Sequence, residues 1–508
     1  MNERKAGILL SYLNFGANSI VMLLYVPMLL YYVSKEQYGI YQMIWSFIGI
    51  ITVLDFGLSA TIKRFVARAD TLYDTAQTQN ILNTSAFLYL VLTGLLVLAG
   101  IGGYFLIAPV YGEALSAADL ATAQQIFLIL LLNFAVCVPG NLFLALLQAK
   151  ERFVFCQLLL FFFTFFTPLV IWGVLVWKAN VIGVVWVQTV CNILIVLGYY
   201  LYCKIRLKAH FVPQYHDSAL LKQLMGFSFF VFIGNLAGQL YSRLGPLVLG
   251  LLAGTLAVAN YYIASQILMA FTVVSSLINA VFLPKLSGDW AVTSSLEMQE
   301  DIFCKTGRLQ GMVALLILTG FILLGKPFLR LWLGPGNEMC YGLALVLMAG
   351  AVLNIMQSVG PCVLLAINKY RYYACVCMGT ALLNMVLAFP LVKWYGTMGC
   401  AVSFTLCVGM FNGILINAYY HKIGFRLERF FKAVWPVIGW SAVALVLLMA
   451  LWRIWPMQTT WMSFFWHGIC VVAVFGGVMA QFVFNRFEWD ILHEIWQKGQ
   501  SLVYRGRF

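Results

Sequence analysis

Polar side chains that could bind a ligand recur along one face of several apolar segments. Asn235, Gln239 and Arg243 follow one another at intervals of four residues, which places them on one face of a helix. A similar face near the N-terminus carries Asn14, Asn18 and Tyr25. Amides and phenols exchange hydrogen bonds with sugar hydroxyls, and arginine presents a planar fork of donors to phosphate oxygens. These residue types therefore suit a sugar chain that is attached to an anionic phosphate.

Four further residues complete the predicted substrate-binding set, namely Asp55, Lys63, Arg64 and Asn279. Each type of residue also has a structural interpretation. Amides and hydroxyls inside apolar helices often join one helix to the next. Arg243 could form a structural ion pair with Asp55, and Lys63 and Arg64 could simply anchor the chain at the cytoplasmic surface.

The sequence carries no motif for enzymatic chemistry. There is no phosphate-binding Walker A loop, and no set of Ser, His, Asp or Cys residues that argues for nucleophilic catalysis. Cys375 and Cys377 form the only close pair of cysteines, and no histidine lies near them in sequence. We therefore expect a protein that is not an enzyme and that has no catalytic residues, no cofactor and no metal site.

The composition is that of a membrane protein. Of 508 residues, 63% are hydrophobic and 10% are charged, whereas a soluble domain is about half apolar and about a quarter charged. The apolar runs are continuous over 20 or more residues, which excludes the short alternating strands of a membrane β-barrel. The composition predicts an all-α polytopic membrane protein, with the lipid bilayer as its surroundings.

About fourteen runs are long enough to cross a bilayer. When the N-terminus is placed in the cytoplasm and the runs alternate, most of the 31 lysines and arginines fall on the cytoplasmic side. The net charge of +13 is then a consequence of topology, and no nucleic-acid partner is needed. We predict a multi-pass membrane protein with both termini in the cytoplasm.

The chain also resembles itself at an offset of about 220 residues. The segment Leu147-Gln148-Ala149-Lys150-Glu151-Arg152 corresponds to Ala366-Ile367-Asn368-Lys369-Tyr370-Arg371, and Asn133 and Pro139 correspond to Asn354 and Pro361. We expect two pseudo-symmetric six-helix lobes with a cleft between them that opens alternately to each face. The predicted parts are an N-terminal lobe at 1–222, a second lobe at 223–432, two additional helices at 433–484 and a cytoplasmic tail at 485–508.

Several short motifs resemble those of bacterial polysaccharide flippases of the O-antigen type, within the multidrug/oligosaccharidyl-lipid/polysaccharide exporter superfamily. They are Leu13-Asn14-Phe15-Gly16, Tyr25-Val26-Pro27, Tyr38-Gly39-Ile40-Tyr41, Leu54-Asp55-Phe56-Gly57-Leu58-Ser59, Asn260-Tyr261-Tyr262 and Phe282-Leu283-Pro284-Lys285-Leu286. The resemblance implies alternating access and a substrate that is an undecaprenyl-pyrophosphate-linked oligosaccharide. It further implies a location in the bacterial inner membrane, an H⁺ or Na⁺ coupling ion, and glycan polymerases as partners in O-antigen, capsule or exopolysaccharide assembly.

One departure from the family pattern concerns ion coupling. Many relatives carry an aspartate near Leu244-Gly245, where this chain reads Ser242-Arg243-Leu244-Gly245-Pro246 and has no acid. Two alternatives to the flippase stay open. The first is another exporter of the superfamily, for drugs or a peptidoglycan lipid precursor. The second is a membrane glycan polymerase or ligase, which the short extracytoplasmic connections disfavour.

Overall fold

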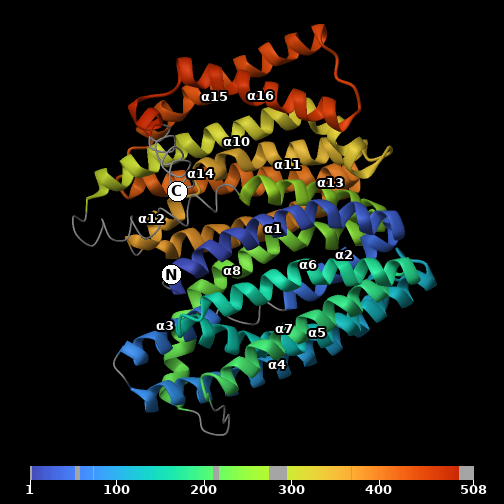
Figure 1. Ribbon diagram of the computed structural model, residues 1–508, viewed down its shortest axis with the longest axis vertical. Coiled ribbons are helices and arrows are strands. Elements are labelled where there is room, and N and C mark those ends of the chain that lie inside the picture. The colour runs from blue at the N-terminus through green and yellow to red at the C-terminus, as the bar shows by residue number, and fades with distance from the viewer. Residues whose placement is uncertain are drawn as a thin grey trace, which may run out of the picture. The chain divides into compact units, whose positions relative to one another are not determined.

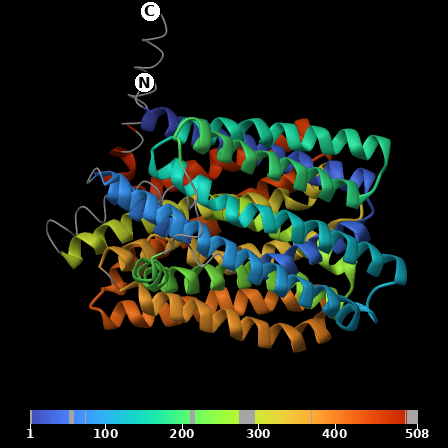
Figure 2. The same cartoon turned by 90° about the horizontal axis from the view of Figure 1, so that it is seen from below.

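The computed structural model describes residues 3–51, 58–71, 74–209, 217–273, 295–367, 369–490 and 493. Throughout these ranges the regular structure is helical, without a strand, as Figures 1 and 2 show. Eleven helices within them are long and apolar enough to cross a membrane. The predicted all-α polytopic membrane fold is therefore confirmed, whereas the number of about fourteen spans stays a prediction.

The chain divides into two compact units. Unit 1 comprises Met1–Tyr262 and Cys377–Cys400, and unit 2 comprises Ile263–Val376 and Ala401–Phe508. A helix at Thr255–Val273 and helix α13 (Tyr370–Phe404) each pass from one unit into the other. The predicted lobe boundaries at 222 and 432 stay a prediction.

Unit 1 consists mainly of eight helices in chain order. They are α1 (Glu3–Tyr32), α2 (Lys35–Ile51), α3 (Leu58–Thr71), α4 (Thr75–Tyr111), α5 (Ala117–Ala149), α6 (Phe153–Trp177), α7 (Val181–Ile205) and α8 (Ser218–Leu252). Helices α4 to α7 run alongside one another in both views. In addition, α1 packs on α6, and α2 packs on both α5 and α8. This arrangement brings α1, α2, α7 and α8 close enough to share polar contacts.

Local sequence signals explain where several of these helices begin. The side chains of Asp74, Ser116 and Asn180 accept hydrogen bonds from backbone N–H groups in the first turns of α4, α5 and α7. Such caps satisfy donors that a helix N-terminus leaves unpaired. Between α5 and α6 the chain turns at Glu151, whose φ is 58°.

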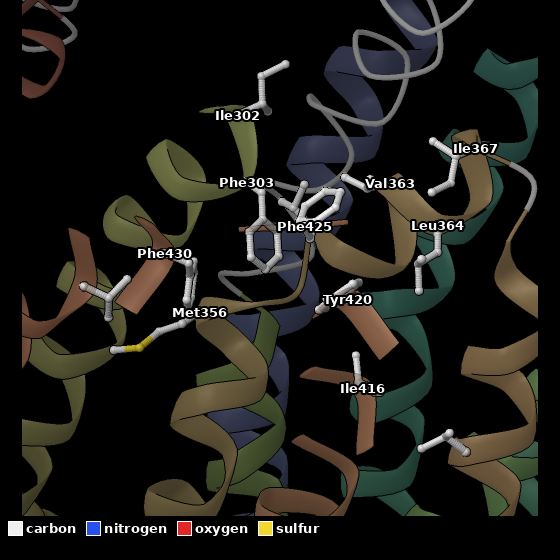
Figure 3. Close-up of a cluster of buried hydrophobic side chains, with 13 residues drawn as sticks. Ile302, Phe303, Met356, Val363, Leu364, Ile367, Ile416, Tyr420, Phe425 and Phe430 are labelled. Atoms are coloured by element: carbon white, nitrogen blue, oxygen red, sulfur yellow. The ribbon is translucent and has the colours of Figure 1, made fainter. Parts of the chain in front are cut away.

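Unit 2 contains α10 (Leu296–Leu333), α11 (Glu338–Met356), α12 (Gly360–Ala366), the π-helix η2 (Thr405–Phe411), α14 (Asn412–Lys422), α15 (Leu427–Ile454) and α16 (Trp461–Phe482). One of its buried clusters centres on Phe303 of α10 (Figure 3). The Phe303 ring lies 4.8 Å from that of Phe430, 5.6 Å from Tyr420 and 5.8 Å from Phe425. These contacts join α10 to α14, to α15 and to the turn between them.

The asparagines that the internal repeat aligns make similar contacts in their own units. In unit 1, Asn133 Nδ2 of α5 donates to Thr189 Oγ1 of α7 at 3.2 Å. In unit 2, Asn354 Nδ2 of α11 donates to the Val408 carbonyl of η2 at 2.7 Å. Each amide thus joins its helix to a helix that follows about 55 residues later. Both contacts agree with the role of amides between apolar helices.

The segment after α16 is fixed to α10 by an interior ion pair that sequence reasoning missed. Arg308 Nε donates to Glu488 Oε1 at 2.9 Å, and the two side chains are 12% and 3% exposed. The Arg308 guanidinium also donates to the carbonyls of Ala433 at 3.1 Å and Val483 at 2.8 Å. One side chain therefore connects α10, α15 and the end of α16 with the start of the tail.

Candidate ligand-binding site

Seven of the ten predicted site residues have side chains that the structure describes, and all seven belong to unit 1. Asn14, Asn18 and Tyr25 lie on α1, Lys63 and Arg64 on α3, and Gln239 and Arg243 on α8. Asp55 and Asn279 lie outside the described residues, so the pairing of Arg243 with Asp55 stays a prediction. Asn235 lies within α8, but its side chain is also outside what the structure describes.

Arg243 lies between α8 and α2 and is held by neutral groups. Its Nε donates to Gln239 Oε1, one turn earlier on α8, at 2.6 Å. One terminal nitrogen donates to the backbone carbonyl of Trp45 on α2 at 3.1 Å. The side chain is partly buried, and no carboxylate pairs with it in the part of the chain that the structure describes. The hydrogen bonds satisfy individual donors but leave the positive charge without a described counter-charge.

A glycine on α2 makes room for this guanidinium. A Cβ atom built on Gly49 would overlap Cζ, Nη1 and Nε of Arg243, which are its three nearest heavy atoms. Gly49 is one helical turn after Trp45, so the carbonyl that receives the arginine and the gap that admits it lie on the same face of α2. The approach of Arg243 to α2 therefore requires glycine at this position.

A second polar contact joins three helices through one amide. Tyr41 of α2 donates its hydroxyl to Gln188 Oε1 of α7 at 2.7 Å. Gln188 Nε2 in turn donates to the hydroxyl of Tyr25 on α1 at 3.0 Å. Gln188 thus connects two tyrosines that are 16 positions apart in the sequence and lie on different helices. The result is a continuous row of amide and phenol groups across α1, α7 and α2.

The tyrosine row and Arg243 meet on one face of α2. Tyr41, Trp45 and Gly49 are spaced by four residues and therefore lie above one another on that face. Tyr262 packs edge-on against Tyr38, with ring centroids 6.1 Å apart. The candidate site therefore combines a cation, an amide and several phenols around α2.

The structure gives the two asparagines of α1 different surroundings. Asn14 Nδ2 donates to both the backbone carbonyl and Oε1 of Gln157 on α6, at 2.8 and 2.7 Å. This is a contact between helices, which favours the structural interpretation of Asn14. Asn14 Oδ1 is buried without a partner among the described residues. Asn18, one turn later, is exposed.

Lys63 and Arg64 belong to a separate basic cluster at one end of unit 1. Lys63 Nζ donates to Gln148 Oε1 of α5 at 2.9 Å, and Lys150 forms an ion pair with Asp70 at 2.6 Å. Arg64 is exposed. The structure therefore holds Lys63 against α5, whereas it holds Arg243 against α2.

Sequence reasoning missed Gln188, Gly49 and the Trp45 carbonyl. Gln188 is a single amide within an apolar run and shows no periodic polar face. The four-residue spacing of Tyr41, Trp45 and Gly49 was the sequence signal that could have indicated this face of α2. Within the described ranges, no group of three or more His, Cys, Asp or Glu side chains is arranged to hold a metal ion.

A family model described as "Polysaccharide biosynthesis protein" matches residues 5–288, which include every helix of the candidate site. The chain belongs to this family. This match confirms the family that the short sequence motifs indicated. A search of functionally curated proteins found no match.

Solved structures with a similar fold include a lipid II flippase and two transporters of the MOP superfamily. The lipid II flippase MurJ, in an inward closed conformation, is 16% identical, with a TM-score of 0.69 over 93% of this chain and 98% of its own. An inward-facing multidrug resistance MATE family transporter of the MOP superfamily is 14% identical, with a TM-score of 0.69 over 82% of this chain and 95% of its own. A MOP superfamily transporter from Pyrococcus furiosus is 14% identical, with a TM-score of 0.56 over 84% and 94%. At these identities the likeness concerns the fold.

Proposed function

We propose that this family member is a flippase that moves undecaprenyl-pyrophosphate-linked oligosaccharide repeat units across the bacterial inner membrane by alternating access. The product would enter O-antigen, capsule or exopolysaccharide assembly. Membership of a polysaccharide biosynthesis family and a fold like that of a lipid II flippase support a lipid-linked cargo. The observation that carries the proposal is the Arg243 guanidinium, whose described partners are all neutral.

An arginine inside an apolar protein is costly unless it has a counter-charge or a function. Arg243 has five N–H donors, and the described hydrogen bonds use its Nε and one terminal nitrogen. A pyrophosphate oxygen would supply both the negative charge and an acceptor for the remaining donors. Arg243 is thus suited to bind the phosphate end of a lipid-linked sugar.

The tyrosine row suits the other end of such a cargo. Tyr25, Gln188 and Tyr41 offer phenol and amide groups that can exchange hydrogen bonds with sugar hydroxyls. Of these three residues, Tyr41 lies on the same face of α2 as the Arg243 contact, so one molecule could reach both Arg243 and the tyrosine row. We propose Arg243, Gln239, Tyr25 and Gln188 as the described residues of the substrate site, with Lys63 and Arg64 at its cytoplasmic mouth.

Export of a peptidoglycan lipid precursor is the second candidate. The MurJ-like fold favours it, and such a precursor carries the same pyrophosphate, so Arg243 would serve both cargoes. A cationic drug is disfavoured because it would be repelled by Arg243. The identity of the sugar therefore has to be decided by transport of defined lipid-linked substrates.

The test compares Arg243→Ala and Arg243→Lys with wild type in liposomes that contain fluorescent lipid-linked oligosaccharide. Loss of a charge-assisted contact costs about 1.5–3 kcal/mol, so we expect Arg243→Ala to slow translocation about 10- to 100-fold. Arg243→Lys keeps the charge and should retain more activity. Arg453→Ala, an exposed cation in the last turn of α15, is the matched control. Wild-type translocation by Arg243→Ala would overturn the proposal.

A further inference from the structure

The Arg243 guanidinium occupies a defined resting place on α2. It lies in the gap at Gly49 and donates to the Trp45 carbonyl, while its Nε stays bonded to Gln239 of its own helix. We propose that this place is a latch between α8 and α2 that an anionic group opens by drawing the guanidinium away from Gly49. This inference rests on the proposed function, because the anion is the pyrophosphate of the cargo.

The partners of Arg243 explain why an anion would displace the latch. In an α-helix, each backbone carbonyl accepts a hydrogen bond from the N–H group four residues later. The Trp45 carbonyl lies within α2 and is positioned for such a bond, so Arg243 is a second donor to it. A neutral carbonyl compensates a donor but not a charge. A phosphate oxygen compensates both, and charge-assisted bonds are about twice as strong as neutral ones.

The two bonds of Arg243 differ in what they connect. The bond to Gln239 lies within α8, whereas the bond to Trp45 crosses to α2. The guanidinium can therefore leave α2 and remain anchored to its own helix. Gln239 would then act as a positioning residue that keeps the Arg243 guanidinium near the site while the terminal nitrogens of Arg243 change partner.

Opening the latch would also reach the tyrosine row. Tyr41 lies two turns before Gly49 on α2 and donates to Gln188, which bonds to Tyr25. When α2 loses its hydrogen bond to Arg243, the face of α2 that carries Tyr41 is no longer held to α8 by that bond. Capture of the phosphate would thereby loosen the phenol groups that we assign to the sugar.

The sharpest test is Gly49→Ala, because the added methyl group fills the space that the Arg243 guanidinium occupies and removes no charge. The three atoms that it would meet first belong to the end of a flexible side chain, which can move aside. Gly238→Ala on α8 is the matched control, since a Cβ at that position meets nothing within 4 Å. The probe is farnesyl pyrophosphate, with farnesol as the uncharged comparison, bound to the purified full-length protein.

We expect Gly49→Ala to bind farnesyl pyrophosphate about tenfold more tightly than wild type, because the competing bond to Trp45 is gone. Gly238→Ala should bind as wild type does, and farnesol should not distinguish the variants. Unchanged or weaker binding by Gly49→Ala would overturn the latch. If Arg243→Ala nevertheless loses affinity, the proposed function stands without it. If Arg243→Ala binds as wild type does, both fail.

A second measurement covers the case in which Gly49→Ala does not fold. Wild-type protein labelled with 5-fluorotryptophan gives a ¹⁹F signal for Trp45, assigned by its loss in Trp45→Phe. We expect farnesyl pyrophosphate, but not farnesol, to shift this signal, and Arg243→Ala to abolish the shift. A Trp45 signal that does not respond to the pyrophosphate would overturn the latch.

Discussion

Glu488 is the residue whose replacement tests most directly how unit 2 holds its C-terminal segment. Its Oε1 accepts from Arg308 Nε at 2.9 Å, and its Oε2 accepts from the backbone N–H of Asn485 at 2.9 Å. Asn485 Oδ1 accepts in return from the N–H of Glu488 at 3.4 Å. Glu488 therefore closes a capping box and an interior ion pair at once.

The magnitude follows from the surroundings of Arg308. Removing one partner of a buried ion pair costs about 3–5 kcal/mol, because the other charge is left uncompensated. Arg308 keeps its bonds to two backbone carbonyls and is 12% exposed, so we expect the lower end for Glu488→Ala, about 3 kcal/mol. Glu488→Gln keeps an acceptor and should lose less. The double change Arg308→Met with Glu488→Met should be milder than Glu488→Ala, since no charge remains buried.

The assay is a double-mutant cycle on the free energy of unfolding, measured by titrating detergent-solubilised protein with SDS. Glu428→Gln is the control, because the pair that Glu428 forms with Lys432 is more than 80% exposed at both side chains. We expect no measurable change for that variant. The cycle consists of Arg308→Met, Glu488→Met and the double variant, and additive losses in it would refute the ion pair as the source of the effect.

Two further predictions concern the tyrosine row and the topology. Gln188→Leu and Tyr41→Phe should each lower the free energy of unfolding by about 1 kcal/mol. The loss in the double variant should be smaller than the sum, because both changes remove the same Tyr41–Gln188 hydrogen bond. Additive losses in the SDS titration would contradict this hydrogen bond. The topology can be tested with single cysteines in a Cys375→Ser background, which removes an exposed native thiol. Cysteines placed at Thr71 and Met298 should react with a membrane-impermeant maleimide added from the cytoplasmic side. Cysteines placed at Glu113 and Met339 should react from the opposite side. The reverse pattern would contradict the proposed orientation.

The helical fold could be predicted because it depends on composition rather than on particular contacts. Continuous apolar runs have to form helices in a bilayer, where every backbone group needs an internal partner. Turns are harder to predict, since they depend on single residues. Between Tyr370 and Lys422 the helical run is interrupted at Gly396, whose backbone is non-helical with a φ of 57°. Only glycine adopts this conformation readily, so the end of one span and the start of the next are marked by one residue.

The candidate site was only partly predictable. The polar face of α8 correctly indicated that Gln239 and Arg243 would lie together, because their spacing is a property of one helix. Asn14 shows the limit of such patterns, since its partner Gln157 lies 143 residues away on α6. Which residue of a distant helix faces a given amide is decided by packing, and no periodicity in one segment reveals it.

Arg243 and Arg308 show why partners, more than residue type, distinguish a functional arginine from a structural one. Both lie against apolar helices, and both donate to backbone carbonyls. Arg308 also has the carboxylate of Glu488, so its charge is compensated within the fold and it needs no ligand. Among the described residues, Arg243 has an amide and a carbonyl as partners and no carboxylate, so in that part of the chain its donors are partly satisfied and its charge has no counter-charge. An interior cation in that condition gains most from an anion that arrives and leaves, which is what a carrier of a phosphate-linked cargo requires.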